Sequence, residues 1–384
     1  MTPPVHILTG EYPPECGGVG DYTRLVAGAL TARGFEVHVW CPAVLEAVQD
    51  GVALHRLPDV FGPGSRRRLQ SAWAASPGSV LLQYVPNALG ARGANLLFCL
   101  WLWRVRRGGA DVRVMFHEPY FYFSWGHPLG NVLAVVQRVM AAVLLRASRV
   151  VYLSTETWLR YLRPLAPLQL PMVVSPIPST VLSDVDPRDV SRWRARHEAQ
   201  DRDAVVVGHF GTFGEHVASE LVHVVPAVLY SHTKARFICI GRGSDAFAAR
   251  LGARHPSLAG RIGATGAISH VDVAAALRAC DVVVQPYPDG VTTRRTSVMA
   301  ALANGVPTVS TAGALTESVW EETEAVALAP ASDARAIGAA VIALLADPTA
   351  RAALAAAGRR TYEERFAIDR TLAALLAGPA AVGV

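Results

Sequence analysis

Residues 4–41 read PVHILTGEYPPECGGVGDYTRLVAGALTARGFEVHVWC, and their pattern decides the fold class. Residues 4–9 form a short apolar run followed by turn residues, which is typical of a buried strand. Residues 22–32 place apolar side chains at helical spacing, and residues 35–41 alternate like a second strand. Strand, loop, helix and strand in this order predict a βαβ unit of a parallel sheet.

The same pattern continues on both sides of a proline-rich stretch at residues 164–178, which is followed by a polar segment at 183–203. We interpret this region as the connection between two domains. Helices are expected near 94–107 and over 132–145. Further strands are predicted at 80–83, 112–116, 150–154, 205–210, 236–240, 282–285 and 308–311. The predicted fold is α/β, with two Rossmann-like, doubly wound parallel-sheet domains of similar size.

The predicted domains are residues 1–180 and 181–360, followed by a last segment at 361–384. Two alanine-rich segments, 333–346 and 349–377, predict C-terminal helices broken near Asp347 and Pro348. We expect the segment 361–384 to pack back towards the N-terminal domain.

Composition excludes several classes of protein. Of 384 residues, 51% are hydrophobic and 17% charged, which argues against disorder. The strongest apolar run, LLFCLWLW at 96–103, is far shorter than the ~18–20 residues that cross a bilayer. The first ten residues lack a basic region before an apolar stretch, so no signal peptide is expected. Five cysteines without a CxxC pair fit a reduced, cytoplasmic protein and predict no zinc ribbon.

Charge is distributed unevenly. The net charge is +5, with 16 basic and 10 acidic residues in 1–180 giving that part +6. An anionic partner would fit, such as a phosphorylated lipid head group, a bilayer surface or an acidic sugar. Ordinary solvated arginines are the alternative. No recognised motif supports nucleic-acid binding.

Two glycine-rich loops follow predicted strands. Gly17, Gly18 and Gly20 precede a helix, where free N–H groups suit a phosphate or a sugar hydroxyl, although a plain turn explains them too. The loop that begins at Gly241 fits G-x-G-x-x-A. The acidic residue expected about 20 positions later in a dinucleotide site is missing, so we expect no NAD.

His117 and Glu118 end the predicted strand 112–116. Polar groups at the carboxyl end of a parallel strand face the ligand crevice, and a histidine there can share a proton near neutral pH. A histidine buried in the core is the alternative. The aromatic residues at 120–125 would stack on a sugar, touch lipid or pack beneath a loop.

Arg294 and Arg295 lie between the strand 282–285 and a helix predicted at 297–303, with Thr293 or Thr296 as its expected cap. A helix dipole contributes roughly 0.3–1 kcal/mol to anion binding, whereas a hydrogen bond to a charged group contributes ~1.5–3 kcal/mol. The arginines therefore dominate, and a diphosphate is the natural ligand. A solvated arginine pair is the alternative.

Further segments complete a pattern that runs through residues 9–319. They are FHE (116–118), HFGTFGEH (209–216), ICIGRGS (238–244), ATGAI (264–268), ACDVVVQPYPDG (279–290) and MAALANGVPTVSTAGALTESV (299–319). With residues 9–40, these segments resemble the retaining glycosyltransferases of family 4, which have the GT-B fold. The resemblance implies two Rossmann-like domains with a cleft between them. It also implies transfer of a sugar from a nucleotide-diphosphate sugar to an acceptor hydroxyl with retention of configuration.

In that reading no cofactor and no metal are needed, and the product is a glycan, a polysaccharide or a glycolipid. The N-terminal domain would bind the acceptor and the C-terminal domain the donor. Gly17, Gly18 and Gly20 match the glycine loop near donor phosphates and acceptor, and His117, with Glu118, matches the histidine that contacts the reacting sugar. The donor-binding residues would be Gly211, Thr212, Gly241, Thr293, Arg294, Arg295, Thr296 and Glu317.

The sequence departs from the family at three positions. Thr212 replaces an arginine that grips the diphosphate, and His216 or Val217 lies where a lysine is usual. The sole lysine, Lys234, is too far along the chain.

The family's paired glutamates fall on Thr292 and Ala300 without gaps. Alternatively, Asp289 takes the place of the first, with three residues inserted, and becomes the third catalytic candidate beside His117 and Glu118. The second glutamate is absent in both alignments. Our hypothesis is that Arg294 and Arg295 supply the lost positive charge.

Two other readings stay open: a non-catalytic nucleotide-sugar-binding or scaffold protein, and a related GT-B enzyme such as an epimerase. Peripheral contact with a membrane through the helix near 94–107, which carries Trp101 and Trp103, is a further hypothesis. No motif specifies the sugar, the nucleotide, the acceptor or the oligomeric state.

Overall fold

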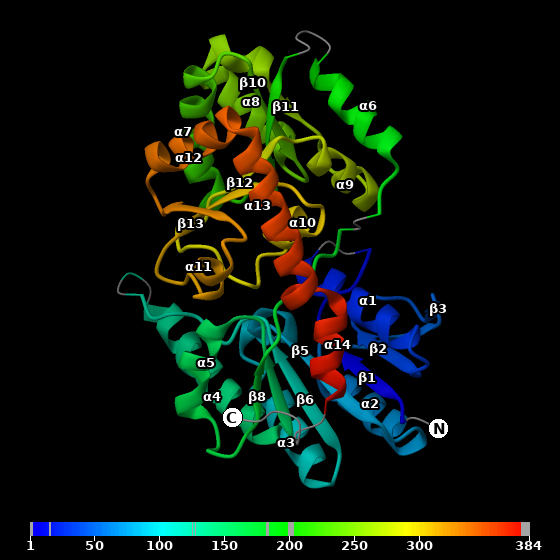
Figure 1. Ribbon diagram of the computed structural model, residues 1–384. Coiled ribbons are helices and arrows are strands. Elements are labelled where there is room, and N and C mark those ends of the chain that lie inside the picture. Colours follow the sequence, from blue (N-terminus) through cyan, green and yellow to red (C-terminus); the bar gives the residue numbers. More distant parts are fainter. Residues whose placement is uncertain are drawn as a thin grey trace. The chain divides into compact units, whose positions relative to one another are not determined.

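The computed structural model describes residues 3–14, 17–124, 126, 128–181, 184–198 and 203–377. The chain forms two compact units (Figure 1). Unit 1 comprises Met1–Ile177 and Ile368–Val384, and unit 2 comprises Pro178–Ala367. The sequence placed the change of domain at residue 180, three residues later. Of the predicted last segment, residues 361–367 belong to unit 2, and residues 378–384 lie outside the described part.

Unit 1 is built on an eight-stranded sheet with the order β3-β4-β2-β1-β5-β6-β7-β8. All neighbouring strands are parallel except β3 and β4, an antiparallel hairpin that the sequence pattern did not reveal. The strands are β1 (Val5–Leu8), β2 (Val37–Cys41), β3 (Ala47–Gln49), β4 (Val52–Arg56), β5 (Ser79–Tyr84), β6 (Asp111–Phe116), β7 (Val150–Leu153) and β8 (Met172–Val174).

Helices cover both faces of this sheet, which is why its central strands are mostly apolar, with His6 and Gln83 as buried exceptions. On β1, Leu8 belongs to the core that also contains side chains of α2 to α5, and Ile7 belongs to the core that contains side chains of α1 and α14. The helices of unit 1 are α1 (Gly18–Thr31), α2 (Pro63–Ala75), α3 (Leu96–Arg107), α4 (Pro128–Ala147), α5 (Glu156–Leu162) and α14 (Ile368–Leu376). Two-sided burial produces the continuous hydrophobic strands expected of a doubly wound fold.

Unit 2 contains a fully parallel six-stranded sheet with the order β11-β10-β9-β12-β13-β14. Its strands are β9 (Val205–Phe210), β10 (Ala235–Ile240), β11 (Ile262–Ala264), β12 (Val282–Gln285), β13 (Thr308–Ala312) and β14 (Ala327–Pro330). Its helices are α6 (Pro187–Glu198), α7 (Glu215–Ser231), α8 (Ser244–Arg254), α9 (His270–Arg278), α10 (Thr296–Ala303), α11 (Val319–Thr323), α12 (Ala334–Ala346) and α13 (Pro348–Thr361). Both units therefore have the predicted α/β architecture.

The alanine-rich C-terminal part is interrupted twice. The predicted break near Asp347 is confirmed, and the Asp347 carboxylate accepts hydrogen bonds from the N–H groups of Thr349 and Ala350 at the start of α13. A second break, which the sequence did not predict, follows a π-helical turn at Tyr362–Phe366. Phe366 is buried against Trp320 in unit 2, so the chain leaves that core before α14 begins in unit 1.

Candidate functional site

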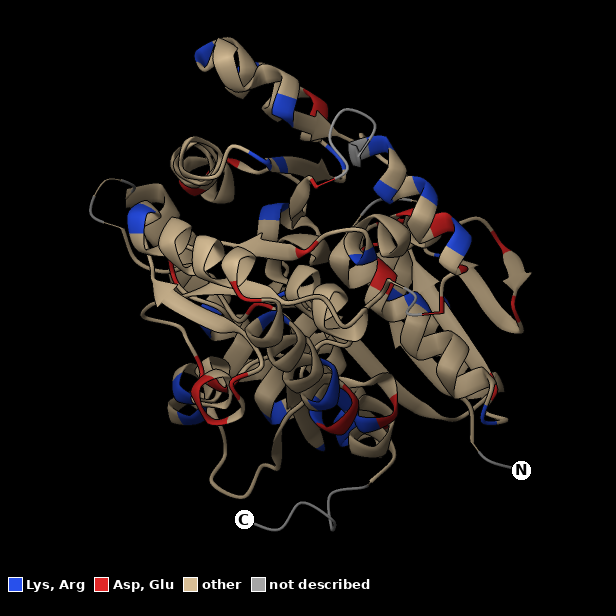
Figure 2. Ribbon diagram, turned by 45° about the horizontal axis from the view of Figure 1, so that its top comes forward, with Lys and Arg blue, Asp and Glu red and all other residues tan. Residues whose placement is uncertain are grey.

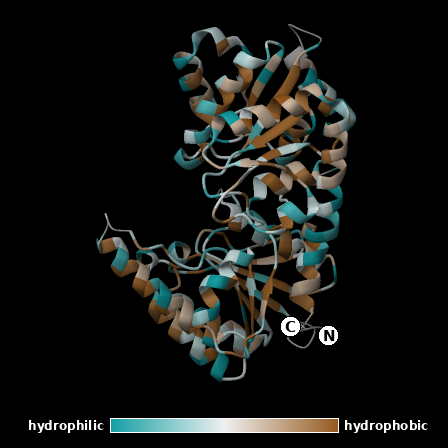
Figure 3. Ribbon diagram, turned by 60° about the vertical axis from the view of Figure 1, so that its left-hand side comes forward, coloured by the Kyte–Doolittle hydropathy of each residue, from teal (hydrophilic) through white to brown (hydrophobic). Residues whose placement is uncertain are grey.

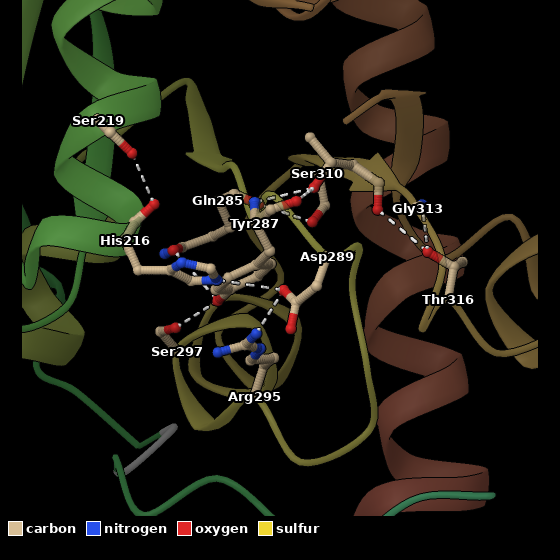
Figure 4. Close-up of polar contacts among 11 residues, drawn as sticks. His216, Ser219, Gln285, Tyr287, Asp289, Arg295, Ser297, Ser310, Gly313 and Thr316 are labelled. Atoms are coloured by element: carbon tan, nitrogen blue, oxygen red, sulfur yellow. Dashed lines mark hydrogen bonds and ion pairs between the residues drawn. The ribbon is translucent and has the colours of Figure 1, made fainter. Parts of the chain in front are cut away.

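The strand order of unit 2 changes direction between β9 and β12, and ligands of open α/β sheets bind at the carboxyl ends of strands at such a point. Residues 211–214 follow β9, and residues 286–295 follow β12. The Gln285 amide donates to the Phe210 carbonyl at 3.1 Å, and the His216 imidazole lies 3.7 Å from the Asp289 carboxylate (Figure 4). The structure therefore brings the loop of Gly211 and Thr212 close to the loop of the two arginines.

Arg295 is held in place rather than solvated. Its guanidinium donates to the Asp289 carboxylate at 2.8 Å and lies 4.3 Å from the centre of the Tyr287 ring. The Arg295 side chain is 19% exposed. Tyr287 is buried, its hydroxyl is 2.7 Å from that of Ser297, and burial raises the pKa of Tyr287 (Figure 4). In this arrangement Asp289 balances the charge of Arg295, and Arg294 is the second, partly exposed guanidinium beside it.

The expectation that Thr293 or Thr296 caps α10 is wrong. The helix starts at Thr296 with Arg295 as its N-cap, and no side chain caps it. Thr293 instead donates its N–H and its hydroxyl, the latter at 2.8 Å, to the Glu317 carboxylate. As an N-cap, the Thr293 hydroxyl would accept a hydrogen bond from a helix N–H. Here it donates to a buried carboxylate, and a hydrogen bond to an ionised group is the stronger of the two. The N-terminal N–H groups of α10 are therefore not covered by a threonine side chain.

Glu317 reaches Thr293 because the loop after β13 packs against the loop after β12. Gly290 has φ +92°, and a Cβ there would lie 2.2 Å from the Thr316 hydroxyl. The Leu315 N–H donates to the Asp289 carbonyl at 2.8 Å. Only glycine fits this contact, so the β13 loop packs against residues 289–290 and carries Glu317, 4% exposed, to the arginine loop.

Gly241 has a packing role in the structure. It has φ +110°, and a Cβ there would lie 2.4 Å from the Gly211 carbonyl oxygen. Its N–H donates to the Thr265 hydroxyl oxygen at 3.0 Å. Gly241 thus allows the loop after β10 to approach the loop after β9, and it supports the position of Gly211 and Thr212.

His209 is the penultimate residue of β9 and was not among the residues singled out from the sequence. Its Nδ1 donates to the Val284 carbonyl at 2.8 Å, and burial lowers the pKa of His209 to about 4. The other ring nitrogen, Nε2, would be 3.1 Å from a Cβ at Gly211. It is therefore a neutral hydrogen-bond acceptor at the carboxyl edge of the sheet.

In unit 1 the strand order reverses between β1 and β5, and His117 follows β6 at the same edge. Its Nε2 lies 2.8 Å from the Gln83 side-chain oxygen, and the Tyr22 ring meets it edge-on at 5.0 Å. Burial lowers the pKa of His117 to about 3. The imidazole therefore stays neutral near pH 7, with Nε2–H donating to Gln83 and Nδ1 left as an acceptor. Glu118, the next residue, is exposed.

The glycine loop of unit 1 is occupied by a carboxylate of the chain itself. Glu11 Oε1 accepts from the N–H groups of Val19 and Gly20, both at 2.9 Å. A Cβ at Gly17, the N-cap of α1, would lie 2.3 Å from Glu11 Oε1, whereas Gly18 faces open space. This capping explains why α1 starts at Gly18 rather than at residue 22. Glu15 and Cys16 of the same loop lie outside the described residues.

A hollow of about 1200 Å³ opens at the other edge of the unit 1 sheet, beside Trp73, Trp101 and the first residues of β1 and β5. It lies at the amino ends of the strands, away from His117. Within the described residues, no group of three or more His, Cys, Asp or Glu side chains is arranged to hold a metal ion.

Both halves of the chain match models of glycosyltransferase families. Residues 16–164 match Glycosyltransferase Family 4, and residues 202–347 match Glycosyl transferases group 1. The protein is a glycosyltransferase of the GT-B type. No curated protein matches this sequence.

Solved structures that resemble this glycosyltransferase cover nearly its whole length. Sucrose-phosphate synthase from Thermosynechococcus elongatus has a TM-score of 0.74 at 17% identity, with 97% of each chain covered. HepE from Anabaena, in complex with UDP and glucose, has a TM-score of 0.72 at 15% identity, covering 97% of this chain and 99% of that one. WaaG, involved in lipopolysaccharide biosynthesis, has a TM-score of 0.67 at 14% identity, with 97% and 100% covered. At these identities the likeness establishes the fold.

Replacing Glu11 with alanine should destabilise unit 1 of the glycosyltransferase. Two N–H groups at the start of α1 would lose their acceptor, which costs about 1–2 kcal/mol of unfolding free energy. Urea unfolding followed by circular dichroism measures this. Glu11→Gln keeps an acceptor oxygen and should recover at least half of the loss. Equal stability of Glu11→Ala and the wild type would contradict the capping role.

Three buried histidines make the stability of the glycosyltransferase sensitive to acid. Burial lowers the pKa of His117 from 6.5 to about 3, and it lowers the pKa values of His6 and His209 to about 4, so the folded state favours the neutral form. The stabilisation is complete above pH 6.5 and is lost as the pH falls towards 4, because the unfolded chain takes up protons first. At pH 5 each histidine should cost of order 2 kcal/mol.

Unfolding free energies between pH 8 and pH 4.5 test this dependence. His223 is exposed on α7, and His223→Asn should leave the profile unchanged. A profile that is flat between pH 7 and pH 5 would show that these histidines ionise without disturbing the fold.

Proposed function

We propose that this glycosyltransferase moves a sugar from a nucleotide-diphosphate sugar to an acceptor hydroxyl with retention of anomeric configuration. The observation that carries the proposal is the pair Arg294 and Arg295 at the start of α10, at the point where the strand order of unit 2 reverses. Guanidinium groups and helix N–H groups together favour a diphosphate. The fully parallel sheet of unit 2 is thus the proposed donor-binding half.

The proposed chemistry needs charge stabilisation more than acid–base catalysis. The acceptor oxygen forms a bond to the anomeric carbon on the face from which the diphosphate departs. The bond from that carbon to the phosphate oxygen breaks, and the leaving phosphate takes the acceptor proton. Negative charge grows on the diphosphate, and guanidinium groups that are already in place lower the barrier.

The remaining residues have supporting roles in this proposal. Glu317 and Tyr287 position the arginine loop, since the first holds Thr293 and the second lies beside Arg295. His117, being neutral, orients the sugar by accepting a hydrogen bond from a sugar hydroxyl at Nδ1. Asp289, paired with Arg295, sets how much positive charge meets the diphosphate.

The relatives suggest the substrates to test first. HepE has been solved with UDP and with UDP-glucose, and WaaG is involved in lipopolysaccharide biosynthesis. We therefore place UDP-hexoses at the head of the donor panel, with GDP- and ADP-sugars after them. Glycan, lipid-linked and small-molecule acceptors belong in the same screen.

A cytoplasmic location is also part of the proposal. The four described cysteines, Cys41, Cys99, Cys239 and Cys280, are buried and free of disulfides. Reduced thiols are the rule in the cytoplasm. Reversible contact with an anionic membrane belongs to the same proposal, because lipid-linked acceptors are found there.

The alternative is a non-catalytic nucleotide-sugar-binding protein. It is favoured by the Asp289–Arg295 ion pair, which reduces the charge available to a diphosphate, and by the missing second glutamate. Release of nucleoside diphosphate separates the two functions. Each donor is incubated with the purified chain and an acceptor mixture, with and without EDTA, while melting temperature is followed in parallel. Turnover supports the transferase; a melting shift without turnover for every donor supports the binding protein.

A further inference from the structure

Helix α4 of unit 1 exposes an apolar face. Leu129, Val132, Val135 and Val139 follow one another at spacings of three and four residues, and they are 45% to 85% exposed. This spacing places them along one side of the helix. The opposite side, which includes Met140, is buried in the core of unit 1. Other exposed aliphatic side chains, such as Leu45 and Leu168, do not form such a row along one helix, and contiguous apolar surface of this kind marks an interaction site.

An aromatic loop extends this face at the start of α4. Phe121, Tyr122 and Phe123 are 39% to 58% exposed. The Arg138 guanidinium lies 4.0 Å from the centre of the Phe123 ring and donates to the Phe121 carbonyl at 3.0 Å. An arginine on the helix therefore fixes aromatic rings beside the aliphatic stripe. Aromatic rings next to basic groups are the usual composition at the boundary between bilayer and water.

The charge of the segment that contains this face favours an anionic partner. Residues 60–155 contain eleven arginines, no lysine and two acidic residues, Asp111 and Glu118, a net charge of +9. The remaining 288 residues sum to −4. Figure 2 colours these basic and acidic residues blue and red. A second copy of the chain would bring an equally positive surface to the contact and be repelled, whereas an anionic bilayer is complementary.

Helix α4 would lie along the bilayer surface rather than cross it. Among the described residues, α4 is the only unbroken helix that is long and apolar enough to cross a bilayer. The segments Ala334–Ala346 and Pro348–Leu376 reach that length and hydropathy only when they are taken together, and they are bent by 108°. The inner side of α4 is committed to the core, with Ala134, Ala141 and Leu144 fully buried. A helix with one face in the protein and one apolar face outside fits the interface plane. Figure 3 colours the ribbon by the hydropathy of each residue.

The earlier expectation of a membrane contact through the helix near 94–107 changes accordingly. In α3 the apolar side chains Phe98, Cys99 and Leu102 are buried, and Trp101 packs on Phe98. Leu97 remains exposed, and Arg104 and Arg107 lie at the C-terminal end. Helix α3 packs directly against α4 and contributes charge, while α4 contributes the apolar surface.

We propose that the outer face of α4, with the loop 121–123 and the arginines of residues 60–155, docks this glycosyltransferase on an anionic lipid bilayer. The face lies in unit 1, outside the proposed nucleotide site of unit 2; the proposal rests on the proposed function and names the surface for its membrane contact. Docking would hold unit 1 at a membrane and would confine a lipid-linked acceptor to its surroundings.

Vesicle sedimentation of the full chain tests the proposal. The probes are phosphatidylcholine vesicles with and without about one quarter phosphatidylglycerol, at low salt. The wild type should bind the anionic vesicles at least 10-fold more tightly and be released by about 0.5 M salt. Val132→Glu with Val135→Glu should lower binding at least 10-fold. Val271→Glu, at a 42% exposed valine on α9 of unit 2, is the matched control and should bind like the wild type.

Three results would overturn the proposal. They are no wild-type binding at low salt, equal binding to neutral vesicles, and wild-type binding by the double variant. Sedimentation equilibrium adds a fourth, since a dimer that the double variant abolishes would make a second copy the partner. Melting shifts with nucleotides, measured on the same variants, report on folding and on the donor site independently of the membrane.

Discussion

Arg295→Ala should weaken binding of a nucleoside diphosphate about 10- to 100-fold. The substitution removes a guanidinium that is fixed by Asp289 and Tyr287 before any ligand arrives. A hydrogen bond to a charged group contributes roughly 1.5–3 kcal/mol, and each 1.4 kcal/mol is a factor of about ten. Isothermal titration with UDP, GDP and ADP measures the effect. Unchanged affinity for the nucleotide that binds best would refute the assignment of Arg295.

Asp289→Asn is the informative companion of Arg295→Ala. If Asp289 serves to balance Arg295, removing its charge should tighten diphosphate binding several-fold and leave kcat within about threefold of the wild type. A catalytic Asp289 would instead lose two or more orders of magnitude in kcat with little change in binding. The double variant with Arg295→Ala should bind like Arg295→Ala alone, because the pair acts as a unit.

Glu317→Ala is expected to be the most damaging single change at the site. The N–H and the hydroxyl of Thr293 would lose their buried acceptor, and orphaned buried donors cost about 1–3 kcal/mol each. The arginine loop would then lose its position relative to α10. We expect kcat/KM to fall at least about 100-fold, since small misplacements of charged groups have effects of this size.

Glu317→Gln separates positioning from charge. An amide can accept from the Thr293 N–H and donate to its hydroxyl, so this variant should retain most of the activity if Glu317 acts by holding the loop. Glu321→Ala, at an exposed carboxylate on the neighbouring α11, is the control and should behave as the wild type. Equal loss in Glu317→Gln and Glu317→Ala would show that the negative charge itself is required.

Hydrophobic periodicity in the sequence predicted most of the strands. The strands β1, β2, β5, β6, β7, β9, β10, β12 and β13 lie where apolar runs and alternation predicted them. The short strands β3, β4, β8, β11 and β14, which lie at or next to the sheet edges, were missed, since strands of three to five residues with partly exposed sides carry a weak periodic signal. The π turn after α13 was missed for a different reason: it depends on Phe366 packing against Trp320, a contact between distant parts of the chain.

The sequence analysis named residues of the candidate site, but it did not predict the hydrogen bonds and ion pairs between them. The sequence placed Arg294 and Arg295 between a strand and a helix, and the structure confirms that position. The expected threonine cap was wrong because Glu317, 24 residues later, takes both donors of Thr293. His209 and Glu11 were overlooked, since no spacing rule shows that a carboxylate at position 11 reaches the N–H groups of residues 19 and 20.

The sequence by itself determined two parallel-sheet units and the loops that follow their strands. Hydrophobic periodicity is a local property, and strand ends are where turn residues must follow. Tertiary structure alone decided which charges are balanced and which N–H groups are already satisfied. Asp289 with Arg295, Glu317 with Thr293 and Glu11 with α1 are pairings across loops, and their geometry exists only once the loops have packed.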